Sequence, residues 1–235
     1  MNLILFSQQE TLQPLPIEDA RAKHILKVLN VEEGCSFDVG QINGPRGKAT
    51  LRVVSSKTLE FEFDWEATIP ELYEIDLLIS YCRPQTCRKI LQECTSLGVR
   101  SMTFFDTEKS EPTYKSSSLW TSRETERLLV RGAEQAFCTQ IPKLSRAASL
   151  SSVISDLPSH GSRIAMDNYE STEKLTPSRT TSLPVTVAIG GERGWSNLER
   201  HILRENEFVL ADLGSRVLRT ETACIAAVSI LRNQL

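Results

Sequence analysis

The spacing of hydrophobic positions changes along the chain near residue 70. Before this point short apolar runs dominate, "TLEFEFDW" (58–65) alternates apolar and polar residues, and the Gly and Pro of "INGPRG" mark a tight turn. The segment 16–30 differs, because its apolar residues recur at helical spacing. Residues 1–70 are therefore expected to form a small β-barrel with one helix.

From residue 71 onward, segments with strand character alternate with segments of helical period. This alternation is typical of a largely parallel sheet that is covered by helices on both faces. The sequence thus predicts an α/β domain over 71–235. Its expected strands lie at 74–82, 99–106, 162–167, 184–190 and 207–212, and its expected helices at 84–98, at 120–137, from Ser196 and from about Thr220.

Composition and charge describe an ordinary folded protein. The 235 residues are 40% hydrophobic and 24% charged, and the formal net charge is -3. Such a chain has no overall attraction for nucleic acid, so a polyanion could be bound only through local patches of cations. The sequence shows neither a signal peptide nor an apolar run long enough for a membrane span, so we expect a cytoplasmic protein without a membrane partner.

Several common chemistries lack their sequence patterns. The six cysteines form no CxxC pair and the three histidines are scattered, so neither structural zinc nor another metal is expected, and the thiols are expected to be reduced and mostly buried. "GGERG" does not have the GxGxxG spacing, and neither a Walker motif nor GxSxG occurs. Nicotinamide, phosphate-loop and serine hydrolase chemistry are therefore disfavoured.

Two segments follow predicted strands, where parallel sheets usually bind ligands. In "VAIGGERGWSNLE" (187–199), three glycines allow close approach of the backbone to a ligand, and Ser196 with Glu199 forms a capping box for the next helix. The alternative is an ordinary tight turn from strand to helix.

The second segment is "DLGSRVLRTETA" (212–223). Gly214 permits a turn, and Thr220 or Thr222 can cap the final helix. Arg216 and Arg219 would then lie beside exposed backbone amides at a positive helix end, a setting that suits an anion or the polar edge of a nucleoside. The alternative is that both arginines are solvated surface residues.

These two segments carry a resemblance to a known family. "IGGERGWS" (189–196), followed by "LGSRVLRTETA" (213–223), closely resembles the signature pair of the ribosomal RNA small subunit methyltransferase E family of the SPOUT superfamily. Weaker likeness at "HILKVLN" (24–30), "ILQECTSLGV" (90–99) and "AEQ" (133–135) extends it over nearly the whole chain. The resemblance implies a PUA-like β-barrel over 1–70, a methyltransferase domain with a deep trefoil knot over 71–235, and a homodimer.

The resemblance also implies S-adenosylmethionine as the cofactor, bound among the knot loops. The residues that would contact it are Met166, Ile189, Gly190, Gly191, Glu192, Gly194, Leu213, Gly214, Leu218 and Thr220. The family methylates N3 of a uridine in small-subunit ribosomal RNA, either as free RNA or in the assembled subunit. For that reaction we expect Arg219 to stabilise the negative charge that develops on the uracil, and Glu221 or a water molecule to help the proton leave.

RNA contacts would come from local cation patches, although each patch can equally be a solvated helix face. The candidates are Arg21, Lys23, His24, Lys27, Arg83, Arg88, Lys89 and Arg216. The sequence departs from the family pattern at Gly191 and Arg193. It also departs at several positions where the family has a charged residue, Thr86 among them. Two alternatives therefore remain open: an RNA-binding protein without catalysis on the same scaffold, and a methyltransferase of this superfamily with another target base.

Overall fold

The chain folds into two compact units. The computed structural model describes residues 3–177 and 182–233. The first unit contains the chain up to Glu71 together with Ala133–Ile141, and the second contains the rest. The return of Ala133–Ile141 to the first unit is not indicated by the sequence. It is held there by the Thr139 hydroxyl, which donates to the carbonyl of Gly44 at 2.6 Å.

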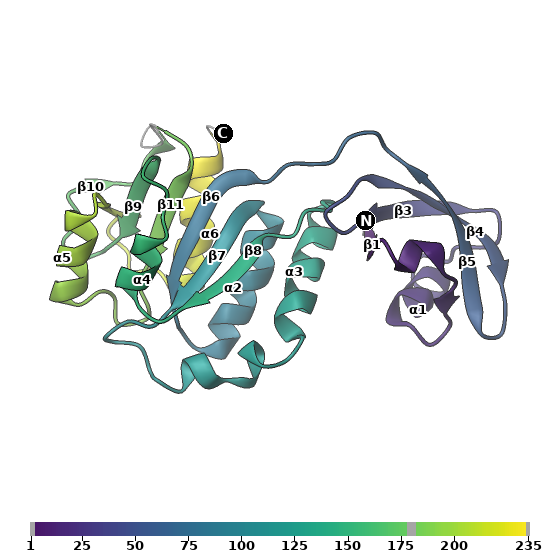
Figure 1. The fold of residues 1–235 in the computed structure, drawn as a ribbon, viewed down its shortest axis with the longest axis horizontal. Helices are drawn as coiled ribbons and strands as arrows, with labels where there is room; N and C mark the ends of the chain where they lie inside the picture. Colours follow the sequence, from purple (N-terminus) through teal and green to yellow (C-terminus); the bar gives the residue numbers. More distant parts are fainter. Residues whose placement is uncertain (1–2, 178–181, 234–235) are drawn as a thin grey trace. The chain divides into compact units, whose positions relative to one another are not determined.

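The first unit is built on a curled five-stranded sheet (Figure 1). Its strand order is β1-β3-β4-β5-β2, with β1 parallel to β3 and the other pairs antiparallel. The expected barrel is present as a half-barrel, because the edge strands β1 and β2 are very short and are not paired with each other. The strands are β1 (Ile4–Phe6), β2 (Leu15–Pro16), β3 (Ser36–Gln41), β4 (Arg46–Val54) and β5 (Thr58–Trp65).

Helix α1 (Ala20–Lys27) fills the concave side of this unit through Ala22 and Ile25, which are fully buried. It is shorter than the helix predicted over 16–30. The Asp19 side chain accepts the backbone N–H of Arg21 and starts the helix, and Asn30 has a positive φ of 51° that no helix continues through.

The Arg21 side chain on α1 forms its hydrogen bonds and ion pairs within the first unit. Its guanidinium donates to Glu10 at 2.6 Å, to Asp19 at 2.8 Å and to the Leu5 carbonyl at 3.1 Å, and it lies 4.9 Å from the centre of the Phe6 ring. Burial alone would raise the pKa of Glu10, but the hydrogen bonds from Arg21 and Ser7 outweigh it and lower that pKa. The hydrogen bond from Arg21 likewise lowers the pKa of Asp19.

The second unit contains a seven-stranded, all-parallel sheet of order β10-β12-β9-β11-β6-β7-β8. This confirms the predicted α/β class. The trefoil knot stays a prediction. The strands are β6 (Tyr73–Ser80), β7 (Val99–Phe105), β8 (Lys143–Ala147), β9 (Ser162–Met166), β10 (Glu173–Lys174), β11 (Val185–Ile189) and β12 (Val209–Asp212).

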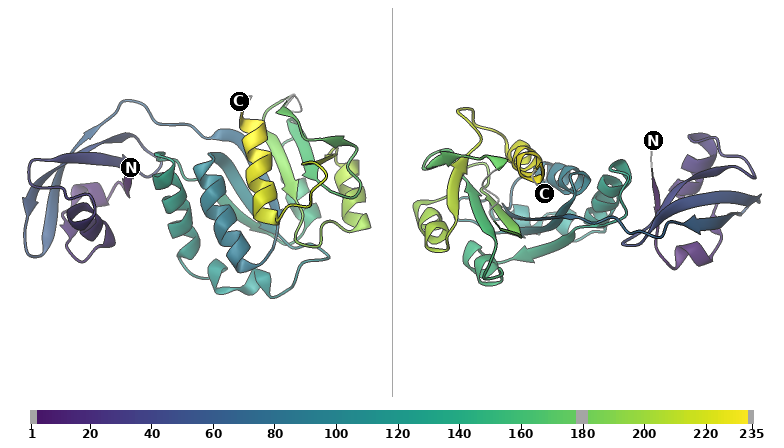
Figure 2. Two further views of the ribbon diagram at one scale, coloured as in Figure 1. Left: turned by 180° about the vertical axis from the view of Figure 1, so that it is seen from behind. Right: turned by 90° about the horizontal axis from the view of Figure 1, so that it is seen from above.

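Helices cover both faces of this sheet. Figure 2 shows α2, α3 and α6 on one side and α4 and α5 on the other. The α4 and α5 side shares a core with alternate strand residues such as Leu78, Ala188 and Leu210. The helices are α2 (Pro84–Ser96), α3 (Glu124–Gln135), α4 (Leu150–Ser155), α5 (Asn197–Glu205) and α6 (Thr220–Arg232).

Helix α6 divides its apolar residues between two faces. Cys224, Ala227, Val228 and Leu231 are buried, and the helix packs against α2, β6 and β11. A second set, Ile225, Ala226 and Ile230, remains partly exposed. The buried face of α6 therefore serves the core of its own domain, and a second apolar face is left partly exposed.

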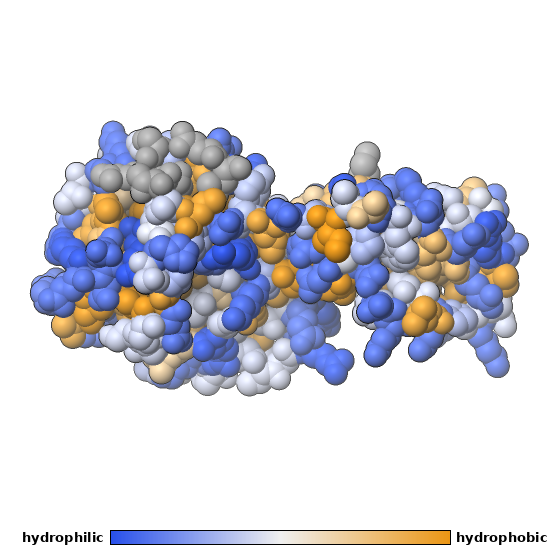
Figure 3. All heavy atoms as spheres, turned by 45° about the horizontal axis from the view of Figure 1, so that its top comes forward, coloured by the Kyte–Doolittle hydropathy of each residue, from blue (hydrophilic) through white to orange (hydrophobic). Residues whose placement is uncertain are grey.

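On the face drawn in Figure 3, polar and apolar residues are interspersed rather than segregated. Within residues 3–177 and 182–233, no helix is both long enough and apolar enough to cross a bilayer. In the same part of the chain, no three histidine, cysteine or acidic side chains gather as metal ligands would. Cys82, Cys87, Cys94 and Cys224 are buried.

We expect Arg21→Met to destabilise the first unit by about 2 kcal/mol near neutral pH, because charge-assisted hydrogen bonds to Glu10 and Asp19 are lost. Both carboxyls have lowered pKa values when folded, so their contribution is present above their ordinary values of 4.5 and 3.8 and is lost as the pH falls below them. Urea unfolding at several pH values should show this, with hydrogen exchange of the β3–β5 amides locating the change. Lys23→Met, which breaks the exposed pair with Glu18, is the control and should have little effect. A loss independent of pH would contradict the assignment.

Candidate functional site

The site lies where neighbouring parallel strands end. Ile189, the last residue of β11, is in register with Met166, the last residue of β9, and with Ile79 near the end of β6. Met166 is in turn in register with Ala211 of β12. The loops that follow these strands therefore leave the sheet at one edge, as the sequence analysis predicted for two of them.

The first glycine loop runs from Gly190 to Trp195. The N–H of Gly194 donates to the carbonyl of Gly191 at 2.9 Å, and Gly194 has a φ of +63°, which favours glycine. The predicted capping box is confirmed: the Ser196 hydroxyl accepts the Glu199 N–H at 3.1 Å, and the Glu199 carboxylate accepts the Ser196 N–H at 2.8 Å. The start of α5 thus fixes the end of the loop.

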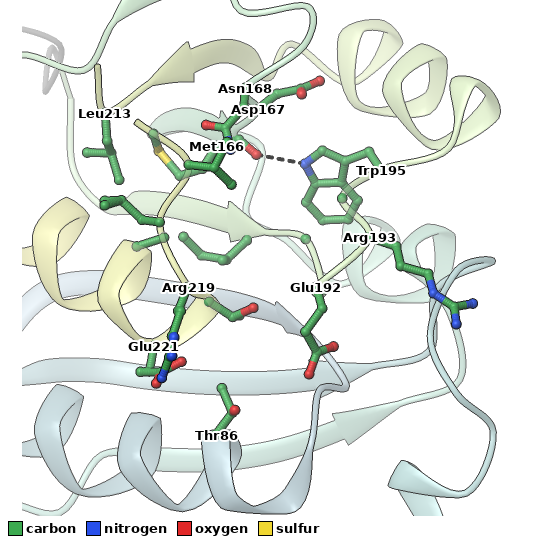
Figure 4. Close-up of a pocket in the computed structure, with 18 of the residues that line it drawn as sticks. Thr86, Met166, Asp167, Asn168, Glu192, Arg193, Trp195, Leu213, Arg219 and Glu221 are labelled. Atoms are coloured by element: carbon green, nitrogen blue, oxygen red, sulfur yellow. Dashed lines mark hydrogen bonds between the residues drawn. The ribbon is translucent and has the colours of Figure 1, made fainter. Parts of the chain in front are cut away.

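Trp195 ties this loop to the neighbouring strand. Its indole is buried, stacks on Phe105, and donates from Nε1 to the carbonyl of Met166 at 2.9 Å (Figure 4). A side chain at Gly190 would have its Cβ 3.3 Å from both the Gly194 backbone and this indole. The glycine therefore permits the loop to close onto its own end.

Arg193, which departs from the family pattern, does not point into the space between the loops, which we call the cradle. Its guanidinium pairs with Glu111 at 2.9 Å, and Figure 4 shows the side chain pointing away from the other labelled residues. The bulky cation is thus compatible with close approach of a ligand to the loop.

The second loop leads from β12 to α6. The Asp212 carboxylate accepts the N–H of Gly214 at 2.7 Å, and Gly214 adopts a φ of +104°. The prediction that Thr220 or Thr222 caps α6 is wrong, because Arg219 occupies the N-cap position and Thr220 is already the first helical residue. An arginine at the cap leaves the first N–H groups of the helix without a side-chain acceptor in the described structure.

The loops enclose one cavity of about 570 Å³. Arg219 and Glu221 line it, as do nearly all of the predicted cofactor contacts. Gly214 and Arg216 do not. The predicted cofactor contacts on its wall are Met166, Ile189, Gly190, Gly191, Glu192, Gly194, Leu213, Leu218 and Thr220.

Several further wall residues were not predicted as site residues. They lie next to predicted positions in sequence or one turn along a helix, but their residue types carry no distinct signal. Asp167, Asn168 and Tyr169 directly follow β9, and this place in the sequence could have indicated them. The wall residues that were not predicted are Asp167, Asn168, Tyr169, Gln85, Thr86, Arg193, Trp195, Val217 and Ala223.

Glu192 and Glu221 place carboxylates on the cavity wall close to the cations Arg83 and Lys89. Glu192 accepts the backbone N–H of Arg83 at 3.0 Å, and Glu221 pairs with the Lys89 ammonium at 3.3 Å. Figure 4 places Glu192, Glu221 and Arg219 on the side nearer α2, across from Met166 and Leu213. The arrangement suits a ligand with an apolar body and a positive charge, flanked by a group that Arg219 can reach.

A buried ion pair supports the loop after β9. Arg200 of α5 donates from Nε to Asp167 and from a second nitrogen to the same carboxylate at 3.3 Å, and both side chains are almost fully buried. The hydrogen bonds to Asp167 raise the pKa of Arg200. The Asp167 carboxylate also accepts the N–H of Tyr169 at 2.8 Å.

The predicted RNA-binding cations fall into two groups. Arg21, Lys23, Arg88 and Lys89 already have carboxylate partners; Arg88 holds Glu124 with two hydrogen bonds of 2.7 and 3.0 Å. For Lys27, Arg83 and Arg216, no ion pair with another described residue is recorded, and all three are exposed. His24, on α1, is half-buried.

Sequence comparison relates the chain to RNA methyltransferases. Residues 70–232 match the model of the RNA methyltransferase domain family. The ribosomal RNA small subunit methyltransferase E of Treponema pallidum is 32% identical over 98% of this chain and 90% of its own length. Ribosomal RNA small subunit methyltransferase E 1 of Borreliella burgdorferi is 27% identical over 100% and 99% of the two chains.

Solved structures share the fold. The ribosomal RNA small subunit methyltransferase E of Neisseria gonorrhoeae, solved with S-adenosylmethionine bound, superposes with a TM-score of 0.80 at 22% identity, covering 98% of this chain and 97% of that one. A methyltransferase from Legionella pneumophila, also in complex with the cofactor, gives 0.79 at 23% identity over 99% and 98%. At this identity the likeness concerns the fold.

We expect Asp167→Ala to destabilise the second unit by about 3 to 5 kcal/mol, because the buried Arg200 loses its main partner and keeps the longer contacts with Asn197 and Glu170. Urea unfolding, with hydrogen exchange of the β9, β11 and β12 amides to report on the second unit, would measure this. Glu111→Ala is the control: it breaks an exposed pair with Arg193 and should cost less than about 1 kcal/mol. Equal, small losses in both variants would show that the Asp167 pair does not hold the loop.

Proposed function

The chain belongs to the ribosomal RNA small subunit methyltransferase E family, and we propose that it transfers a methyl group from S-adenosylmethionine to N3 of a uridine in small-subunit ribosomal RNA. The observation that carries this proposal is the convergence of two glycine loops and the end of β9 on one cavity that Arg219 also lines. Wall residues from distant parts of the sequence meet there, as a binding site requires.

The cavity fits the proposed cofactor. Met166, Ile189, Leu213 and Leu218 supply apolar surface, and the glycine loop supplies backbone groups for a polar ring. Glu192 and Glu221 supply negative charge on one wall. When bound, S-adenosylmethionine provides an electrophilic methyl group on a positively charged sulfur, so carboxylates near it are favourable.

Arg219 is the residue best placed to assist the acceptor base. The N3–H bond of uracil must break while the N3–CH₃ bond forms, and negative charge then develops on the neighbouring uracil oxygens. Arg219 lines the cavity, is exposed, and has no ion pair with another described residue. A guanidinium with free donors can stabilise that charge by hydrogen bonds.

Glu221 also forms an ion pair that bears on its proposed role. Its carboxylate is mostly buried in the first turn of α6 and is held by Lys89 at 3.3 Å. We propose that Lys89 orients this carboxylate, which then accepts the uracil proton directly or through a water molecule. The positively charged start of α6 favours the carboxylate in the same place.

The alternative of an RNA-binding protein without catalysis loses one of its supports. It was favoured by Arg193, whose bulk could have blocked the first loop. Because Arg193 pairs with Glu111 outside the cradle, the loop retains its open backbone surface. A different target base within the same superfamily remains the alternative that a mapped product would reveal.

We further propose that the enzyme is a homodimer. The support is the partly exposed apolar face of α6, formed by Ile225, Ala226 and Ile230. Its buried face already serves the core of its own domain. A second copy of the chain would cover the remaining face.

Arg219→Ala should reduce methyl transfer by about 10² or more, because charge on the acceptor is no longer stabilised. Affinity for S-adenosylmethionine, measured by calorimetry, should be retained. Transfer of a labelled methyl group to small-subunit ribosomal RNA, with the product mapped, gives the rate and the target. Arg193→Ala is the matched control and should keep normal turnover, since its side chain lies outside the cradle. Normal turnover in the Arg219 variant would refute its role.

Unpaired cations should dominate RNA binding. Lys27→Ala and Arg216→Ala should each weaken binding and reduce the slope of log affinity against log salt by about 1. Arg88→Ala should change the slope little, because its charge is already balanced by Glu124. Fluorescence anisotropy with an RNA fragment at several salt concentrations would measure all three variants. An equal change of slope in all three would contradict this prediction and mean that the Arg88–Glu124 pair opens on binding.

A further inference from the structure

Tyr169 exposes a large aromatic ring at the wall of the cavity. The residue is 79% exposed, whereas Trp195 and Phe105 close by are 1% and 0% exposed. A single exposed aromatic residue is common on protein surfaces. What distinguishes Tyr169 is that its position is fixed by buried groups.

Two contacts orient the residue. Its N–H donates to the Asp167 carboxylate at 2.8 Å, which fixes the bend after β9, and the Arg200 guanidinium lies 5.5 Å from the ring centre. Arg200 is itself buried and bound to Asp167. The ring is therefore held in place while most of its surface stays open to solvent, which lowers the entropy lost when a partner stacks on it.

The ring also lies across from the first glycine loop. A Cβ on Gly194 would be 3.8 Å from Cε2 of Tyr169, so the ring borders that loop without being covered by it. The exposed residues that line the same cavity include the cations Arg83 and Arg219, for which no ion pair is seen among the described residues, and also the carboxylate Glu192. An oriented aromatic ring among unpaired cations is the combination that binds single-stranded nucleic acid, by stacking and by contact with phosphates.

Resting on the proposed function, we propose that Tyr169 stacks against a nucleobase of the RNA substrate at the mouth of the cavity, and that this contact helps select the sequence around the target. A base that is methylated at an edge used for pairing must leave its helix or loop stack. A preformed ring at the entrance replaces part of the stacking that is lost.

The exposure of Tyr169 separates this role from cofactor binding. The cavity residues assigned to the cofactor include Met166 and Ile189, which are 8% and 2% exposed. Tyr169 lies on the same wall but faces solvent.

The test compares Tyr169→Leu, which keeps apolar bulk without a ring, with Tyr169→Phe, which keeps the ring. Affinity for an RNA fragment that carries the target is measured by anisotropy, methyl transfer by label incorporation, and S-adenosylmethionine affinity by calorimetry. We expect Tyr169→Leu to weaken RNA affinity and raise KM for RNA by about ten-fold, with kcat and cofactor affinity retained. Tyr169→Phe should behave as the wild type. Leu198→Ala, at an exposed apolar position of α5 that does not line the cavity, is the surface control and should also be unchanged.

A second arm locates the base. RNA fragments with a single abasic site near the target are compared on the wild type and on Tyr169→Leu. At one position, loss of the base should weaken binding to the wild type but not to the variant.

The outcomes separate the two proposals. Unchanged RNA affinity in Tyr169→Leu, additive effects at every abasic position, or a loss of cofactor affinity instead would each overturn the stacking role. Failure of the wild type to methylate the RNA at all, while it still binds, would overturn the proposed function and leave the binding arms to decide on Tyr169.

Discussion

The parallel pairing of β6, β11, β9 and β12 is the constraint on which the site depends. In a parallel sheet the carboxyl ends of the strands lie at one edge, and the registers here bring Ile79, Ile189, Met166 and Ala211 to nearly the same level. Every loop of the cavity begins from that edge, and helices α2 and α6 start beside it. The backbone N–H groups at these helix starts, together with the flexible glycines, make the edge a binding surface before any particular side chain is considered.

Electrostatics in this protein is local. The net charge of -3 gives no general attraction for RNA, and many arginines serve the fold: Arg21, Arg88 and Arg200 are each held by a carboxylate. Among the described residues few cations remain available, so the proposed recognition of RNA would combine them with contacts of another kind. An aromatic ring and the shape of the cavity are suited to this, because stacking does not depend on net charge.

The first loop shows how a changed signature can keep an open backbone surface. Arg193 departs from the family pattern, but its side chain points away from the cavity and pairs with Glu111. Gly191 also departs from the family pattern, and a Cβ at that position would lie 3.1 Å from the Ser80 hydroxyl, so the hydroxyl would have to shift slightly. The loop conformation is set by Gly194, Trp195 and the capping box of α5, all of which the chain retains.

The sequence by itself determined the α/β class, the two glycine loops and the capping box, because hydrophobic period, glycine and cap residues act over a few neighbours. Strand β5 (Thr58–Trp65) was predicted from its alternation alone. Strand β8 was not, since "KLSRA" has little apolar content and pairs only at the edge of the sheet. Only the tertiary structure decided which charges are free: the partners of Arg21, Arg88 and Arg193 lie between 2 and 82 positions away in sequence. It also decided that Asp167, Arg200 and Tyr169 act together, because their contact requires β9 and α5 to be placed by the sheet, and no local pattern records that distance.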